Sequence, residues 1–153
     1  MLYEISIKDL QPQTTACIRV CIKPERISAV LGEILPELWD YLERSEIPTA
    51  GPPFARYFEM KDDLVDLEAG LPVSGVVPGK GQIISGELPG GLAAFTWHIG
   101  PYGWLSQAHK ALEIWIRDQE RQPAGPPWEV YWTDPGEVSN PSEWKTEVIW
   151  PIQ

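Results

Sequence analysis

Residues 124–152 read AGPPWEVYWTDPGEVSNPSEWKTEVIWPI, and this segment decides the fold. Residues 128–133 and 145–150 are rich in aromatic and β-branched side chains, and Pro, Gly, Asp and Asn fill the interval between them. This pattern predicts two β-strands joined by a loop. Side chains alternate across a strand, so Thr146, Val148 and Trp150 are expected on one face and Glu147 on the opposite face. The sequence therefore predicts a carboxylate in the middle of an apolar final strand.

An earlier segment repeats this design. Residues 50–53 read AGPP, as residues 124–127 do, and at the same offset of 74 residues three aromatic pairs align: Phe54 with Trp128, Tyr57 with Tyr131, and Phe58 with Trp132. Each block also ends in a strand with a glutamate four residues before a proline, Glu68 in the first and Glu147 in the second. These matches indicate an internal duplication. We expect one domain over residues 1–153, built from pseudo-repeats 1–74 and 75–153.

Hydrophobic periodicity places the other elements. Helical spacing of apolar residues predicts helices over residues 24–46 and 104–121, with alternating strands on both sides of each. Strands at 82–88 and 92–99 are expected to form a hairpin across Pro89, Gly90 and Gly91. The layout predicts an α+β fold of duplicated βαββ-type halves, each with an added N-terminal hairpin strand. Antiparallel sheets, two main helices and a central cleft between the halves complete the expected architecture.

The net charge of the chain limits the kinds of molecule that it is expected to bind. The chain has 22 acidic and 12 basic side chains, a formal net charge of −10. That field repels phosphate backbones, which argues against direct nucleic-acid binding, and it favours cationic ligands. No run of apolar residues is long enough to span a membrane. The opening MLYEISIKDL alternates like a strand and differs from a signal peptide, so a cytoplasmic protein is expected.

Cysteine and histidine positions argue against cofactor chemistry. Cys17 and Cys21 lie four residues apart on one predicted strand, which puts their Cα atoms about 13 Å apart, too far for a disulfide. We expect two buried, reduced thiols. His98 is expected to organise the turn before the second helix and His109 to lie at the surface. No metal-site spacing, phosphate loop or Ser–His–Asp pattern is present, so no cofactor is expected.

Three motifs carry a family resemblance. HIGPY at 98–102, PWEVYWTDP at 127–135 and WKTEVIWP at 144–151 resemble the GyrI-like effector-binding domains, which are small-molecule binding modules found alone or fused to helix-turn-helix regulators. The resemblance covers nearly the whole chain and suggests a standalone member. It implies a duplicated βαββ core with a central cleft for bulky, aromatic and often cationic ligands, with Glu147 as the cation's partner. Without a DNA-binding segment, a regulatory role would need a separate partner.

The candidate ligand-binding residues are two glutamates, two tyrosines at equivalent strand positions and three tryptophans: Glu147, Glu68, Tyr57, Tyr131, Trp97, Trp104 and Trp132. A carboxylate in a pocket needs a compensating cation, a phenol or a ligand charge, and aromatic rings stack on planar or cationic groups. Arg56 and Lys145 are the basic residues expected to neutralise the glutamates. The plainer alternative is solvated strand glutamates and aromatic residues that only fill the core.

Three functions fit these residues. The first is binding of bulky aromatic, lipophilic and cationic small molecules, with Glu147 selecting charge. The second follows from the resemblance: a cofactor-independent hydrolase of cyclopropane-bearing natural products, in which Glu147 is the catalytic residue that directs water and Tyr131 or Tyr57 assists. Turnover of a reactive ligand separates these two. The third is an interaction subunit for a transcriptional regulator or gyrase.

Overall fold

The computed structural model describes residues 2–153, which form two compact units. We name each unit by the candidate glutamate that it contains. The Glu68 unit comprises residues 11–90, and the Glu147 unit comprises the N-terminal segment up to Leu10 together with residues 91–153. The chain therefore leaves the Glu147 unit after its first strand and returns to it at Gly91. Each unit is described by itself.

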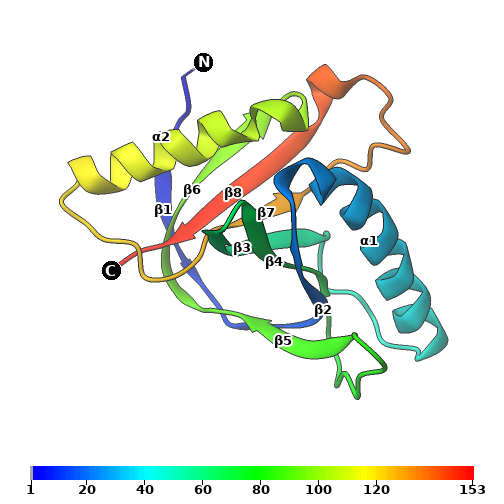
Figure 1. Cartoon of the computed structure of the whole chain (residues 1–153). Helices are drawn as coiled ribbons and strands as arrows, with labels where there is room; N and C mark the ends of the chain where they lie inside the picture. The colour runs from blue at the N-terminus through cyan, green and yellow to red at the C-terminus, as the bar shows by residue number, and fades with distance from the viewer. Residues whose placement is uncertain (1) are drawn as a thin grey trace. The chain divides into compact units, whose positions relative to one another are not determined.

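The Glu68 unit is a four-stranded antiparallel sheet with one long helix on one face (Figure 1). Its strands pair in the order β5-β2-β4-β3, and the helix packs on β4 and β2. Along the chain its elements are β2 (Gln13–Ile22), η1 (Pro24–Arg26), α1 (Ile27–Arg44), β3 (Phe54–Lys61), β4 (Leu64–Pro72) and β5 (Ile84–Leu88).

The Glu147 unit repeats this plan. Its strands pair in the order β1-β6-β8-β7, and its helix packs on β6 and β8. Its elements are β1 (Ser6–Leu10), β6 (Gly91–Ile99), η2 (Tyr102–Trp104), α2 (Leu105–Asp118), β7 (Trp128–Tyr131), η3 (Pro141–Glu143) and β8 (Lys145–Pro151). The registers match as well, because Arg56 lies opposite Glu68 and Val130 lies opposite Glu147. The α+β fold with duplicated βαββ-type halves is as expected, while the repeat boundary at residue 74 and the central cleft stay predictions.

The expected hairpin at residues 82–99 does not form. β5 pairs with β2, and β6 pairs with β1 and β8. A strand has only two edges for hydrogen bonding, so β6 has no edge left for β5 once β1 and β8 occupy both. The short connection at Pro89 and Gly90 therefore links two units instead of reversing the chain. In each unit the strand that pairs with the first strand of the βαββ motif comes from a distant part of the sequence. β5 pairs with β2, and β1 pairs with β6.

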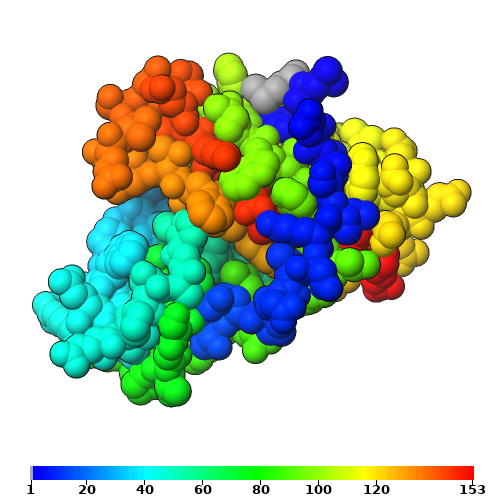
Figure 2. All heavy atoms as spheres, turned by 180° about the vertical axis from the view of Figure 1, so that it is seen from behind, coloured from blue at the N-terminus to red at the C-terminus, as the bar shows by residue number. Residues whose placement is uncertain are grey.

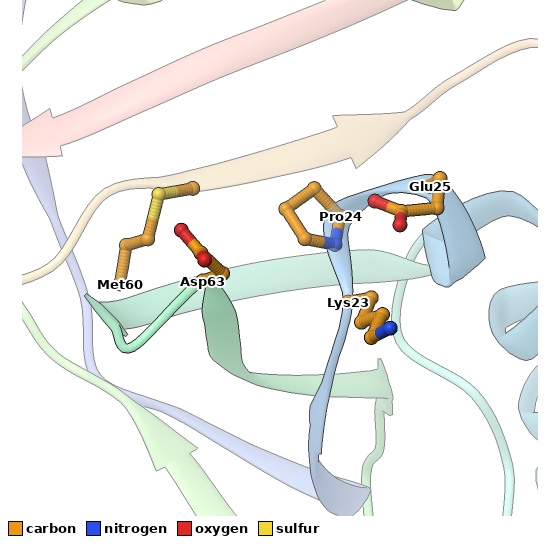
Figure 3. Close-up of a pocket in the computed structure, with 5 residues that line it drawn as sticks. All are labelled: Lys23, Pro24, Glu25, Met60 and Asp63. Atoms are coloured by element: carbon orange, nitrogen blue, oxygen red, sulfur yellow. The ribbon is translucent and has the colours of Figure 1, made fainter.

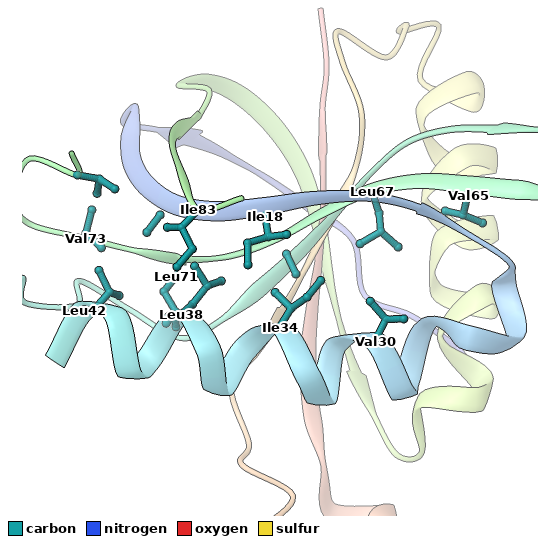
Figure 4. Packing of buried hydrophobic residues seen from close by; sticks show 13 residues of the cluster. Ile18, Val30, Ile34, Leu38, Leu42, Val65, Leu67, Leu71, Val73 and Ile83 are labelled. Carbon is teal, nitrogen blue, oxygen red and sulfur yellow. The ribbon is translucent and has the colours of Figure 1, made fainter. Parts of the chain in front are cut away.

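Each helix buries one stripe of side chains against its own sheet. In α1 the stripe is Val30, Ile34, Leu38 and Leu42, and Figure 4 shows these residues pointing toward Ile18, Leu67 and Leu71 of β2 and β4. In α2 the corresponding stripe is Leu105, Ala108, Leu112 and Ile116. Spacings of three and four residues place these side chains on one helical face. Full burial of a leucine contributes about 1.5–3 kcal/mol, so these stripes attach the helices to the sheets.

The helices begin later than the sequence predicts. A 3-10 turn starts at Pro24 and another at Tyr102, and the α-helices follow from Ile27 and Leu105. Proline suits the first turn because it has no N–H to leave unpaired. Pro36 lies inside α1, as expected, one turn after Gly32. Among the described residues, no helix is both long and apolar enough to cross a membrane.

Candidate functional site

Strand alternation separates the two faces of the Glu147 sheet. Val148 and Trp150 of β8 pack in the core beneath α2. Glu147 points to the other face, where Trp97 of β6 and Val130 of β7 lie directly opposite it across the two strand pairs. Residues opposite each other in adjacent strands project to the same side of a sheet. Glu147 and Trp97 therefore share the face that α2 leaves uncovered.

The Glu147 carboxylate is buried and has two donors from different parts of the chain. It is 2% exposed. Oε2 accepts a hydrogen bond from Lys8 Nζ at 2.5 Å, and Oε1 accepts one from Trp132 Nε1 at 3.2 Å. A buried carboxylate is stable only when its charge is compensated and its oxygens are hydrogen-bonded. The sheet face thus holds an anion whose counter-ion is the protein's own ammonium group.

Aromatic rings surround this ion pair. The Lys8 ammonium lies 4.4 Å from the ring centroid of Phe95, a cation–π distance. The rings of Trp97 and Trp132 lie 5.9 Å apart at an interplanar angle of 56°. We call the set Lys8, Phe95, Trp97, Trp132 and Glu147 the carboxylate–aromatic cluster. It combines the two kinds of group that recognise organic cations.

Lys8 and Phe95 are the two members of the cluster that sequence reasoning missed, and Lys8 is the one that carries the positive charge. Lys145, one of the two expected partners, instead places its Nζ 4.2 Å over the ring of Trp97. Lys8 lies on β1, and nothing local links that strand to β8, 139 residues away. It reaches Glu147 because β1 pairs with β6, which pairs with β8. The sequence did show an alternating N-terminal strand with one central lysine. It did not show which strand that N-terminal strand pairs with.

Glu68 occupies the equivalent position in the other unit with different neighbours. It is 7% exposed, Arg56 Nη1 lies 3.9 Å from its Oε1, and the Cys17 thiol donates to its Oε2 at 3.7 Å. Burial raises the pKa of Glu68 above its ordinary value, although the positive charge of Arg56 opposes the shift. Burial, followed by the nearby negative charge of Glu68, raises the pKa of Cys17 to about 12. Arg56 is one of the two basic residues expected to neutralise the glutamates, and it lies beside Glu68.

A second ion pair lies beside Glu68. Arg19 donates from Nε and Nη2 to the two carboxylate oxygens of Asp66, at 2.9 and 2.8 Å. This pairing lowers the pKa of Asp66. The guanidinium carbons of Arg19 and Arg56 lie 3.9 and 5.0 Å from the ring centroid of Phe58. On this face of the Glu68 unit, the arginines bind the carboxylates and lie over the Phe58 ring.

Tyr131 lies on the helix-covered face of its sheet, away from Glu147. Its hydroxyl donates to Glu129 Oε1 at 2.7 Å, and Glu129 Oε2 accepts from His109 Nε2 at 2.7 Å. The expectation that His109 is a surface residue is wrong, because it is half-buried and bonded to a buried glutamate. Helix packing turns this part of α2 toward β7, which the charged neighbours of His109 in the sequence do not reveal. Glu129 is a buried carboxylate that sequence reasoning did not single out.

Two further candidates lie apart from the carboxylate–aromatic cluster. Tyr57 packs against the core beneath α1. Trp104 ends η2 and is 54% exposed. His98 has the role expected for it, because it is fully buried, accepts from the Tyr3 hydroxyl at Nδ1 and donates from Nε2 to the carbonyl of Pro101 before η2. Of the seven sequence candidates, the structure brings together Glu147, Trp97 and Trp132.

The Glu68 unit also has a hollow at the end of its sheet. Its volume is about 380 Å³, and it is lined by Lys23, Pro24, Glu25, Met60 and Asp63 (Figure 3). Three of these side chains are charged and Met60 is 67% exposed, so the hollow lacks the apolar walls typical of a small-molecule site. Within residues 2–153, no group of three or more His, Cys, Asp or Glu side chains is arranged to hold a metal ion.

Cys17 and Cys21 are free thiols, as expected. The expectation that both are buried is wrong for Cys21, which is exposed. Cys17 lies in the interior of β2, whereas Cys21 lies near the end of that strand, opposite Asp66. Alternation puts both thiols on one face of the strand but does not say how far along the strand that face is covered.

Taken together, the chain is a duplicated α+β domain with one buried carboxylate per unit on the sheet face away from the helix. A model of one family, described as the GyrI-like small molecule binding domain, matches residues 3–153. The chain therefore belongs to the GyrI-like family of small-molecule binding domains. A search of curated protein sequences finds no match.

Solved structures share the whole fold. The C-terminal domain of EcmrR is 23% identical with a TM-score of 0.90, and the match covers 100% of this chain and 99% of that domain. In the EcmrR–DNA complex the chain spans only 58% of the longer EcmrR chain. SAV2435 bound to tetraphenylphosphonium is 12% identical over 100% of this chain and 94% of that chain, with a TM-score of 0.63. A hydrolase from Listeria innocua is 10% identical over 98% of this chain and 92% of that chain, with a TM-score of 0.69. At these identities the likeness concerns the fold.

Proposed function

We propose that this domain binds bulky, lipophilic organic cations, with Glu147 as the charge-selecting group and Trp97 and Trp132 as the aromatic surface. The observation that supports this most is the resident ammonium of Lys8, held between the Glu147 carboxylate and the ring of Phe95. Because this site already binds an alkylammonium group through a carboxylate and an aromatic ring, it offers the contacts that an organic cation needs. Carboxylate attraction and cation–π contact both act on the ligand charge, and the rings add apolar burial.

A relative of the same fold supports the choice of ligand class. The structure of SAV2435 is described as bound to tetraphenylphosphonium, a lipophilic cation with four aromatic rings. At 12% identity that ligand cannot be assigned to this chain by descent, so it serves here as a probe. The net charge of −10 also favours the approach of cations from solution.

The hydrolase alternative lacks a supporting arrangement. In that mechanism Tyr131 assists Glu147, but Tyr131 is on the opposite face of the sheet and donates to Glu129. Tyr57, the other candidate, packs in the core of the Glu68 unit. The interaction-subunit alternative likewise has no particular residue in its favour among those described.

The test compares a cation with a neutral molecule of similar size. Tetraphenylphosphonium and triphenylphosphine oxide are titrated into wild type and Glu147→Gln, and quenching of the eight tryptophans is followed at two salt concentrations. Losing a charge-assisted contact costs about 1.5–3 kcal/mol, so the cation should bind roughly 10-fold weaker or worse in the variant. The neutral molecule should change less than about twofold. Equal losses for both, or none, would contradict the proposal.

A further inference from the structure

Lys8 and Glu147 differ in their access to solvent. The Lys8 side chain is 36% exposed, whereas that of Glu147 is 3% exposed. Figure 2 shows the N-terminal segment, in dark blue, at the surface beside the yellow-green atoms of β6. An ammonium on a flexible four-carbon stem at the surface can move into water, where it is strongly hydrated. The buried carboxylate cannot leave, because it is fixed in the middle of β8.

We infer that Lys8 is an internal competitor for the ligand-binding carboxylate, so that an organic cation binds by displacing its ammonium from Glu147. This inference rests on the proposed function and adds the residue that sets its affinity and selectivity. While Lys8 is engaged, the cluster carries no net charge. When Lys8 swings out, Glu147 requires another cation, and a ligand that brings one together with aromatic surface takes its place.

Competition explains how the unliganded domain tolerates a buried carboxylate. A buried charge left without a partner is strongly destabilising, so an empty cation site would weaken the fold. Lys8 removes that cost, and in return it lowers the apparent affinity for every ligand that needs the same carboxylate. The dissociation constant rises in proportion as the fraction of open sites falls. A contact present nine-tenths of the time weakens cation binding about tenfold.

Selectivity follows from the same arrangement. Trp132 Nε1 holds one carboxylate oxygen and Lys8 holds the other, so a single positive charge is exchanged. A neutral ligand has nothing to offer Glu147 and leaves Lys8 in place. Lys8 therefore makes the site discriminate by charge, because only a cation compensates for its departure.

The experiment uses Lys8→Met, which keeps most of the stem and removes the charge. Lys110→Met, a change at an exposed lysine of α2, alters the net charge equally and serves as the matched control. We expect Lys8→Met to bind tetraphenylphosphonium about tenfold tighter than the control does, while triphenylphosphine oxide changes less than twofold. In a Glu147→Gln background the gain from Lys8→Met should vanish, because the competed group is absent.

Stability provides a second readout, since Lys8→Met leaves Glu147 without its ammonium. The variant should melt below wild type without ligand, and saturating tetraphenylphosphonium should raise its melting temperature more than it raises that of wild type. Three results would overturn the inference: cation affinity within twofold of the Lys110→Met control, an equal gain for the neutral molecule, or a variant that stays unfolded with saturating cation.

The two proposals fail in different ways. If wild type binds neither probe, or if Glu147→Gln weakens both probes equally, the proposed function fails. If wild type prefers the cation and Glu147→Gln abolishes the preference, but Lys8→Met brings no gain, the proposed function stands and only the competition fails.

Discussion

Glu147 and Glu68 occupy equivalent strand positions, yet their surroundings differ in the residues that face them across the sheet. Trp97 and Val130 lie opposite Glu147, while Arg19 and Arg56 lie opposite Glu68. One carboxylate is thus flanked by an aromatic and an aliphatic side chain, and its cation comes from a partly exposed lysine on the added strand. The other is flanked by two guanidinium groups. Duplication supplied two equal backbone positions, and the neighbouring side chains gave them different chemistry.

The same contrast appears two residues further along β4 and β8. Gly70 lies opposite Phe54 in one unit, and Ile149 lies opposite Trp128 in the other. A Cβ on Gly70 would lie 2.7 Å from both the Phe54 ring and the carbonyl oxygen of Ala16. The Phe54 ring therefore packs directly over Gly70, on the same sheet face as Glu68. The Glu68 carboxylate faces charged partners of its own unit, and the Glu147 face is the one that the proposed function assigns to the ligand.

The largest expected effect tests this packing. Gly70→Ala should lower the free energy of unfolding by about 2–3 kcal/mol, because the backbone of β2 and the buried Phe54 ring leave no room for a methyl group. Urea unfolding followed by circular dichroism measures it. Gly32→Ala is the matched control, since nothing lies within 4 Å of a Cβ at that position of α1. It should stabilise by about 0.5–1 kcal/mol. A loss below about 0.5 kcal/mol for Gly70→Ala would contradict this packing.

A smaller effect concerns the pH dependence of Glu68. Its raised pKa means that the folded protein holds this proton more tightly than the unfolded chain does. The contribution of Glu68 to stability is therefore largest below its unfolded value of 4.5 and is lost as the pH rises through the higher folded pKa. Glu68→Gln cannot ionise and escapes this loss. Its stability relative to wild type should improve from pH 4 to pH 8.

Chemical unfolding at several pH values gives that difference, with Glu113→Gln on the exposed part of α2 as the control for removing one acidic group. Tetraphenylphosphonium binding should change less than about twofold in Glu68→Gln, in contrast to Glu147→Gln. A relative stability that falls with rising pH would show that ionised Glu68 is net stabilising. A large loss of cation binding would instead place Glu68 in the ligand site.

The smallest expected effect is at Asp66. Asp66→Asn removes the pair with Arg19, whose side chain is 50% exposed. Exposed ion pairs contribute about 0.2–1 kcal/mol and are screened by salt, so the cost should be near 0.5 kcal/mol and should shrink at high ionic strength. Because the pKa of Asp66 is lowered in the folded protein, its contribution is present above its unfolded value of 3.8 and lost as the pH falls through the folded pKa. A salt-independent cost above about 1.5 kcal/mol would mean that Asp66 also supports the Glu68 region.

Much of the fold was predictable because it depends on local periodicity. The helical stripe from Val30 to Leu42 and the alternation around Glu147 are written in the spacing of apolar residues, and each was placed on the correct face. The repeated AGPP segments and the paired glutamates marked the duplication in the same way. These features can be predicted without knowing which distant segments pack together. An amphipathic helix or strand carries the spacing of its apolar residues in its own sequence.

The sequence by itself determined the α+β class, the duplication and the carboxylate in an apolar strand. Tertiary structure alone decided that β1 pairs with β6 and β5 with β2, because sequence neighbours do not reveal which strand takes a free edge. That pairing carries Lys8 to Glu147, and helix packing carries His109 to Glu129. Tyr131 was expected beside Glu147, and only the register between β7 and β8 shows that the two side chains lie on opposite faces of the sheet. The sequence pattern around a charged strand residue is the same whether its side chain is solvated or bonded to a buried counter-ion. Only the pairing of strands that are distant in the sequence decides between these two environments.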